Sequence, residues 1–331
     1  MKMKLSLIDT LKFSGEINHG KWIKEQAQLY AEGVINPITK ACSSAYHNKK
    51  FKVPGAYGSA ATVWSKRQGS ILLIECSAAK FLTGHNVFGD DDLPRLVTAI
   101  FKAVCRHLGI KPTSNEKSAI KNGNVRLYRL DLATHIKLPT HIAVCDFIQA
   151  LKTQLVFTRR SFSTYADQSI YIDQGSDMKS TKFYDKWEEL LFHKLPNSLP
   201  DKEFIKNHAK NMLRIEMTFR NRFLKDSGMS IVSDFNIKQA QNIIKDEIFS
   251  LNLTDQSLLQ GNHKYKLGGL KNCLLALHSS GFNLKKLFNE RQIKEHSKEI
   301  FKKTGINILT PSSAIKFSMI PVKKYLAKLD F

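Results

Sequence analysis

The sequence predicts an α+β fold, in which a mainly antiparallel sheet with helices on one face is followed by a mainly helical C-terminal domain. Strand-like segments alternate irregularly with helical ones, and hairpin-like turns separate several strands. From residue 236 onward the spacing of apolar residues is almost wholly helical. We therefore expect two domains, 1–228 and 236–331, with the boundary near 228–236.

The strands are identified by alternating or continuous apolar residues between turns. The run 71–74 is continuously apolar, as in a strand covered on both faces. In segment 212–220 the apolar residues share one face, while Arg214, Glu216 and Thr218 share the other. The predicted strands are 2–13, 60–64, 71–76, 125–132, 168–173 and 212–220.

The clearest predicted helix is 92–108, whose apolar residues form one stripe. Asp91 or Asp92 can cap it, Pro94 suits its first turn, and Gly109 can end it. A second amphipathic helix is expected at 144–155. Further helices are expected at 21–32, 237–251, 270–278, 284–288 and 292–303.

Composition indicates a nucleic-acid partner. The 331 residues include 51 Lys and Arg against 29 Asp and Glu, a net charge of +22 that is spread along the chain. No apolar run approaches the ~20 residues that span a bilayer. Acidic and basic residues interrupt any signal-peptide core, so we expect a cytoplasmic protein without membrane contact. The five cysteines form no C-x-x-C pair, which excludes a zinc ribbon and argues against disulfides.

The stretch 180–190 places Tyr184 among lysines and acids, at the expected start of an amphipathic helix. Alone, it fits a half-exposed packing tyrosine equally well. The chain also holds three acids in or at the ends of strands and a histidine in a glycine-flanked turn: Glu75, Asp131, Glu216 and His85. Oxygen ligands of this kind suit Mg²⁺ or Mn²⁺. A metal site beside a tyrosine nucleophile predicts phosphodiester cleavage.

The acids have two interpretations. Asp131 and Glu216 each follow an arginine by two positions, on the same strand face. For either acid alone, a structural Arg–carboxylate pair explains the pattern as well as a metal ligand does. Both acids together, with Glu75 at another strand end, favour a shared metal cleft. His85 is expected to contact metal or phosphate, because its flanking glycines permit close backbone approach. His135 and His141 are expected on the surface, since a proline between them interrupts regular ligand spacing.

Basic and aromatic residues are expected to hold DNA. Lys186 can stabilise a phenolate or the pentacoordinate phosphate, which is useful because a tyrosine with a pKa of ~10 is a poor nucleophile at neutral pH. Phe219 and Phe223 are spaced so that one packs inward and the other can stack on a base. The arginines expected to contact DNA are Arg129, Arg159, Arg160, Arg214, Arg220 and Arg222.

Four segments carry a resemblance to a known family. They are 75–89 (ECSAAKFLTGHNVFG), 129–131 (RLD), 182–186 (KFYDK) and 213–228 (LRIEMTFRNRFLKDSG). In this order they are similar to the gene II replication initiators of filamentous bacteriophages, over residues 60–228. Segment 292–308 is more weakly similar to the wider II/X family of phage and plasmid replication proteins. The most specific element is 80–89.

The resemblance implies a rolling-circle tyrosine endonuclease that nicks one strand of the replicative-form origin with the help of a metal. Tyr184 would form a 5′-phosphotyrosine, free a 3′-OH as primer, and allow later strand closure. Asp131, Glu216 and His85 match the family's acidic and Gly-His-Asn positions, but the usual His-hydrophobic-His strand is absent. The implied partners are double-stranded origin DNA, displaced single-stranded DNA, and a host helicase and polymerase in a bacterial cell.

A non-catalytic, sequence-specific DNA-binding protein, such as a phage or plasmid repressor, is the alternative. Segment 284–308 has helix–turn–helix-like spacing, and basic charge alone would serve such a protein. A repressor has no need of Tyr184 beside three acids in or at the ends of strands. Formation of a covalent protein–DNA adduct separates the two functions.

Overall fold

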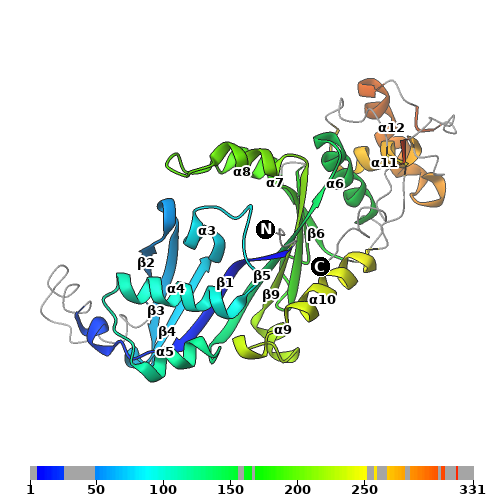
Figure 1. Ribbon diagram of the computed structural model, residues 1–331. Coiled ribbons are helices and arrows are strands. Elements are labelled where there is room, and N and C mark those ends of the chain that lie inside the picture. Colours follow the sequence, from blue (N-terminus) through cyan, green and yellow to red (C-terminus); the bar gives the residue numbers. More distant parts are fainter. Residues whose placement is uncertain are drawn as a thin grey trace, which may run out of the picture.

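The computed structural model describes residues 6–25, 49–155, 160–165, 168–251, 257–258, 267–279, 284–304, 307–309 and 318–319. Within these residues, nine strands form one antiparallel sheet in the order β2-β3-β4-β1-β5-β9-β8-β7-β6 (Figure 1). The strands are β1 Ser6–Glu16, β2 Phe51–Pro54, β3 Ala60–Lys66, β4 Ile71–Ser77, β5 Arg126–Lys137, β6 Phe162–Tyr165, β7 Ser169–Ile172, β8 Lys179–Asp185 and β9 Met212–Arg220. The predicted α+β fold with an antiparallel sheet is confirmed.

One face of the sheet is apolar and is covered by helices. Alternate residues of the central strands, such as Leu130 and Leu132 of β5 and Ile215 and Met217 of β9, are fully buried there. They share one hydrophobic core with α4 (Leu93–His107), α6 (His141–Leu155) and α10 (Ile237–Ser250). Asp92 caps α4 as predicted, since its side chain accepts from the backbone N–H of Arg95 at 3.1 Å.

A β-bulge interrupts the pairing of β1 with β5. Ile8 pairs with Leu132 and Leu11 pairs with Leu130, so that Asp9 and Thr10 together lie opposite Asp131. The extra residue lets Ile8 and Leu11 both enter the core although they are three positions apart. It also turns Asp9 to the opposite, polar face of the sheet.

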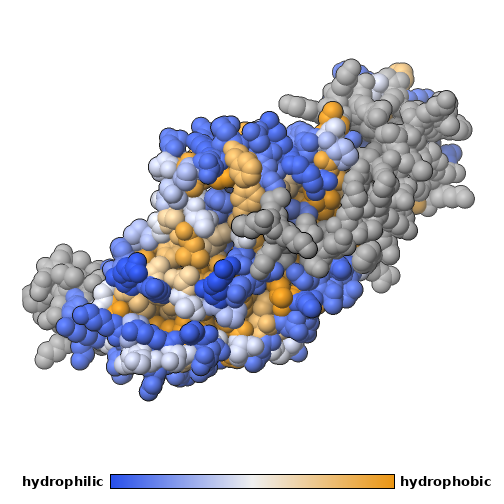
Figure 2. Space-filling model, viewed as in Figure 1, coloured by the Kyte–Doolittle hydropathy of each residue, from blue (hydrophilic) through white to orange (hydrophobic). Residues whose placement is uncertain are grey.

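The polar face is covered at one end by α3 (Ala78–Thr83), α7 (Lys186–Phe192) and α8 (Lys202–Ala209) (Figure 1). A small apolar cluster holds α7 and α8 to the segment after α3, through Val87, Leu190 and Ile205. In the space-filling view, hydrophilic residues cover these helices and α4, with apolar residues gathered between them (Figure 2). Further helices of this part are α5 (Ser114–Lys121), α9 (Asn221–Asp226) and the helical residues 20–25.

Several elements differ from the prediction. Tyr184 lies on strand β8, and the helix begins two residues later. The sequence did not predict strand β8, because the polar residues Thr181 and Asp185 lie on its core face and the aromatic Tyr184 lies on its polar face, which hides the alternation. Segment 125–132 is the start of a longer strand that continues through His135. Of the expected helix 21–32, the residues after Glu25 lie outside the described part of the chain.

The C-terminal half contains the helices expected there. α10 packs in the core of the sheet, so the hydrophobic core continues past the expected boundary near 228–236. α11 (Gly269–Ser279) and α12 (Glu290–Thr304) form a separate small core with Leu284 and Ile308. Segment Leu284–Lys286 is a 3₁₀ turn, shorter than the predicted helix, and β10 (Ser257–Leu258) pairs with β11 (Ser318–Met319). None of the described helices has both the length and the apolar character needed to cross a membrane.

Candidate active site

Tyr184 lies near the end of strand β8 on the polar face of the sheet. It pairs with Arg214 across the sheet, and only 4% of the residue is exposed. Its hydroxyl donates to Oε2 of Glu216 at 3.1 Å. Burial raises the pKa of Tyr184 well above its ordinary value, despite the opposing charge of Arg214. The resting phenol is therefore neutral and oriented by a carboxylate.

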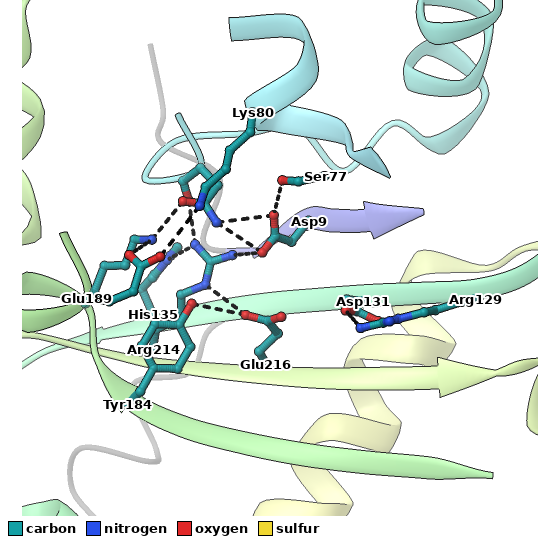
Figure 3. Close-up of polar contacts among 12 residues, drawn as sticks. Asp9, Ser77, Lys80, Arg129, Asp131, His135, Tyr184, Glu189, Arg214 and Glu216 are labelled. Carbon is teal, nitrogen blue, oxygen red and sulfur yellow. Dashed lines mark hydrogen bonds and ion pairs between the residues drawn. The ribbon is translucent and has the colours of Figure 1, made fainter. Parts of the chain in front are cut away.

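Arg214 is the centre of this site (Figure 3). It is completely buried, and one amino group donates to Asp9 at 2.8 Å while the other donates to the carbonyl of Asn86. Its Nε lies 3.5 Å from Glu216, and Nη1 lies 3.3 Å from Nε2 of His135. The expected direct contact of Arg214 with DNA is incompatible with this burial. Its charge acts inside the protein instead.

Lys186 is the second buried cation. Its ammonium group donates to Oδ1 of Asn86 at 2.8 Å and to Glu189 at 2.6 Å. Burial, and then the charge of Arg214, lower the pKa of Lys186 to about 8, although the carboxylate of Glu189 acts in the opposite direction. Its ammonium lies 6.0 Å from the ring centroid of Tyr184. Lys186 therefore lies on the same side of the strand end as the phenol, and its catalytic role stays a prediction.

Asp9 joins the two cations. Asn86 donates its side-chain amide to both oxygens of Asp9, at 3.1 and 3.3 Å, and Ser77 donates at 2.7 Å. Burial raises the pKa of Asp9, but the charges of Arg214 and Lys186 and the hydrogen bond from Ser77 outweigh it, so the pKa is lowered overall. Asp9 is thus an ionised carboxylate held between two buried cations.

The predicted metal ligands lie on the same sheet face but are not gathered into one cage. Asp131 accepts two hydrogen bonds from Arg129, at 2.8 and 2.6 Å, and Figure 3 shows this pair apart from Arg214. Glu75 forms an ion pair with Lys12 at 3.4 Å. Asp131 is thus paired with Arg129, as the alternative interpretation expects, and a metal role for Asp131 stays a proposal.

Asp131 and Glu216 nevertheless influence each other. Burial raises the pKa of each carboxyl group, and the charge of Asp9 raises both pKa values further. Asp131 adds to the shift in the pKa of Glu216. Three like-charged groups in a buried site repel each other, which a divalent cation would relieve.

His85 borders this network without forming a hydrogen bond in it. Its ring packs edge-on against Phe88, with 5.7 Å between centroids, and its Nδ1 is buried without a hydrogen-bond partner. Burial, and then the charge of Lys186, lower its pKa. A neutral imidazole with an unpaired nitrogen can accept a ligand, which keeps His85 as a proposal for metal or phosphate contact.

The other residues expected to contact DNA lie in different environments. Arg160 is paired with Asp173 and Glu247, Arg220 donates to the carbonyl of Gln174 at 3.0 Å, and Arg222 pairs with Asp177 at 2.8 Å on the surface. Arg159 lies outside the described residues. Phe223 stacks on Phe219, with ring centroids 5.3 Å apart, so it packs on the core and does not project toward a base.

Sequence reasoning missed Asp9, Asn86, His135 and Glu189. Asp9 is a single acid in an apolar strand, and this pattern could have indicated a functional residue. Asn86 stands next to His85 in the segment singled out by resemblance. His135 follows Asp131 at strand spacing on the same face, and burial lowers its pKa well below the ordinary value, so the surface prediction for it was wrong. Glu189 lies one helical turn after Lys186.

Together, fold and site define an antiparallel-sheet protein whose polar face carries a buried tyrosine–carboxylate–arginine centre. Residues 2–238 match the N-terminal part of the replication-associated protein family of phages, the gene II proteins. The chain is 24% identical over 304 residues to the replication-associated protein of Enterobacteria phage I2-2, covering 89% of this chain and 88% of that one. A structure of a rolling-circle replication initiator protein from Geobacillus stearothermophilus is similar with a TM-score of 0.33 and 10% identity, over 83% of this chain and 96% of that one.

Because the family match spans well over half of the sequence, the chain belongs to this family of phage replication-associated proteins. The resemblance seen in the sequence segments is thereby confirmed at the level of the family.

Proposed function

We propose that this protein initiates rolling-circle DNA replication by nicking one strand of a double-stranded origin through Tyr184. The observation that carries the proposal is the hydrogen bond from the Tyr184 hydroxyl to Glu216, next to the buried cations Arg214 and Lys186. A non-catalytic DNA-binding protein has no use for a phenol held in this way. Membership of the replication-associated family supports the same conclusion.

The proposed reaction is a transesterification. The phenolic oxygen of Tyr184 bonds to phosphorus, and Glu216 accepts the phenolic proton. The bond from phosphorus to the 3′ oxygen breaks, and this leaving oxygen takes up a proton from water. The products are a 5′-phosphotyrosine and a 3′-OH that can prime a polymerase. The reverse reaction on a new 3′-OH closes the displaced strand without an external energy source, because the phosphotyrosine linkage retains the free energy of the cleaved phosphodiester bond.

Cations of the chain stabilise the charge that develops at phosphorus. Lys182 lies on the same strand face as Tyr184, with its ammonium 4.1 Å from the ring centroid, and is partly exposed. A phosphate that approaches the phenol from solvent meets Lys182 before it reaches the buried Lys186. We propose that Lys182 receives the phosphate and that Lys186 stabilises the phenolic oxygen.

Mg²⁺ or Mn²⁺ is the cofactor proposed for this reaction. Asp131 and Glu216, with Asp9 near them, are the acids that fit it, because their oxygens are hard ligands and their mutual repulsion favours a cation. When bound there, the ion would neutralise charge on the phosphate. Glu75 lies on β4, with β1 and β5 between it and Glu216 on β9, so it is not a primary candidate.

Metal dependence can be tested by substitution and chelation. We expect excess EDTA to abolish cleavage, and Mg²⁺ or Mn²⁺ to restore it. Glu216→Gln and Asp131→Asn should each raise the metal concentration for half-maximal cleavage by about 10-fold or more. Asp177→Asn, at an exposed acid, is the matched control. Full activity in EDTA would remove the metal from the mechanism. If Asp131→Asn had the metal dependence of the wild type, Asp131 would be only a structural partner of Arg129.

The covalent intermediate is the direct test of the proposed function. The full-length protein would be incubated with an end-labelled single-stranded oligonucleotide from the origin and denatured. We expect a labelled adduct, and peptide mapping should place the nucleotide on Tyr184. Sequence-specific binding without any adduct, under conditions where supercoiled origin DNA stays intact, would favour the repressor.

A basic cavity on the same sheet face offers a path for single-stranded DNA. Its volume is about 430 Å³, and it lies over β1, β3 and β4, away from the end that carries Tyr184. The ammonium groups of Lys12 and Lys50 lie 5.0 and 5.5 Å from the ring centroid of Trp64. Its lining residues are Lys12, Lys50, Trp64, Lys66, Leu73, Tyr128 and Asn221. Cations beside aromatic rings are typical of non-specific single-strand binding.

The salt dependence of binding tests this path. Lys50→Ala combined with Lys66→Ala should flatten the log–log salt slope on single-stranded DNA by about 1.4, since each phosphate contact contributes about 0.7. Lys102→Ala with Lys121→Ala removes the same charge from exposed positions on the helical side and should leave the slope unchanged. Equal slopes for the two double variants would show that DNA does not follow this cavity.

The C-terminal helices are proposed to add affinity for duplex DNA. α12 carries Lys302 and Lys303 in its last turn, and α11 and α12 share their own core. We keep 236–331 as the proposed DNA-binding part, with α10 also serving the core of the sheet. A host helicase and polymerase are the proposed partners, because a nick supplies a primer but neither opens the duplex nor extends the strand.

A further inference from the structure

Three metal-ligand side chains meet on the opposite side of the strand end that carries Tyr184. His141 is the first residue of α6, Cys145 lies one turn further along it, and Asp185 ends β8. One ligand atom of each lies within 4.8 Å of the other two. In the part of the chain that the structure describes, this is the one group of three or more metal-binding side chains with that spacing.

Two ligand atoms in the group are buried and unsatisfied. Nε2 of His141 and Oδ2 of Asp185 lie 2.7 Å apart, yet both lack a hydrogen-bond partner of acceptable geometry. Asp185 is 1% exposed, and its other oxygen already caps α7 by accepting from the backbone N–H groups of Trp187 and Glu188. Buried polar atoms normally make well-formed hydrogen bonds, so these two atoms, at ion-pair distance but without one, could both turn toward a shared metal ion beside them.

A fourth donor is available from α7. Oε1 of Glu188 lies 3.4 Å from Nε2 of His141, and its side chain is only partly buried. The set therefore offers one sulfur, one nitrogen and carboxylate oxygens. Thiolate with imidazole selects Zn²⁺ or a similar borderline ion over Mg²⁺, and four such donors match its tetrahedral preference.

We propose that His141, Cys145, Asp185 and Glu188 bind one Zn²⁺, with loss of the thiol proton of Cys145. The ion would tie the first turn of α6 to the junction of β8 and α7. Asp185 stands between Tyr184 and Lys186, and successive strand residues point to opposite faces, so the ion would fix the backbone of both without entering the phosphate site. This is a structural clip, separate from the Mg²⁺ or Mn²⁺ site proposed above.

Metal binding by the full-length protein tests the clip. After metal removal and dialysis against Zn²⁺, we expect one equivalent per chain by elemental analysis, retained in a large excess of Mg²⁺. Co²⁺ in its place should show a thiolate-to-metal charge-transfer band. With free Zn²⁺ at a hundred times its Kd, the melting temperature should rise by about 5–10 °C. Hydrogen exchange at 179–192 should slow on Zn²⁺ binding.

Matched variants make the result specific. Cys145→Ser should remove the charge-transfer band and the thermal shift, and Glu188→Gln should weaken binding, while Cys105→Ser and His107→Ala should behave as wild type. The metal-free melting curve of each variant checks that it folds. If the wild-type Co²⁺ complex lacks the band, or if Cys145→Ser binds Zn²⁺ as tightly as wild type, the proposal is overturned. If a variant does not fold, the presence or absence of the charge-transfer band in the wild-type Co²⁺ complex still tests the proposal.

Discussion

Tyr184→Phe is expected to lower covalent joining and nicking by at least a thousand-fold, which corresponds to about 4 kcal/mol on the barrier. The substitution removes only the attacking oxygen, and the ring keeps its packing at a position that is 4% exposed. Origin binding should therefore stay within about two-fold of wild type. The measurements are adduct formation on a single-stranded oligonucleotide, nicking of supercoiled origin DNA, and binding to the same origin.

Tyr171→Phe is the matched control for this variant. Tyr171 lies on the neighbouring strand β7, opposite Lys182, whose ammonium is 4.9 Å from its ring centroid. It thus shares the cation with Tyr184 but does not bond to Glu216. If Tyr171→Phe lost the adduct and Tyr184→Phe retained it, the nucleophile would be reassigned to the neighbouring strand.

The sequence was sufficient for the elements whose pattern is local. α4 carries its own cap, proline and apolar stripe, and β9 carries strict alternation, so both could be assigned from their own residues. β8 could not, because the polar residues Thr181 and Asp185 face the core while the aromatic Tyr184 faces the polar side, so the period of two is hidden. Likewise α10 has an ordinary amphipathic pattern that does not reveal which core it joins.

The candidate site was predictable in its residue types but not in its contacts. Arg214 looked like a surface cation because arginine is rarely buried. Its burial depends on Asp9, which lies 205 positions away and is aimed at it by a β-bulge. The residue pattern within either segment therefore cannot predict that Arg214 and Asp9 are in contact. The same holds for Asn86 and Lys186, which are 100 positions apart and meet because the fold brings the segment after α3 to the start of α7.

Arg214→Met is expected to destabilise the protein by about 3–5 kcal/mol, because leaving a buried carboxylate without its partner costs more than an intact pair contributes. Methionine fills much of the same volume, but Asp9 and Glu216 lose the buried cation between them and the carbonyl of Asn86 loses its donor. Arg214→Lys should recover only part of the loss, because one ammonium cannot reach Asp9, Asn86 and Glu216 at once. Urea denaturation measures the free energy of unfolding.

The origin of the loss can be separated from simple cavity formation by a double-mutant cycle. Asp9→Asn in the Arg214→Met background removes the orphaned charge, so the double variant should be more stable than Arg214→Met alone, with the coupling expected between contacting residues. Arg222→Met, at an exposed ion pair with Asp177, should leave stability unchanged. Additive effects of Asp9→Asn and Arg214→Met would mean that the two side chains do not share one buried charge network. The Asp9–Arg214 ion pair, which connects β1 to β9 across β5, would then not account for the loss of stability.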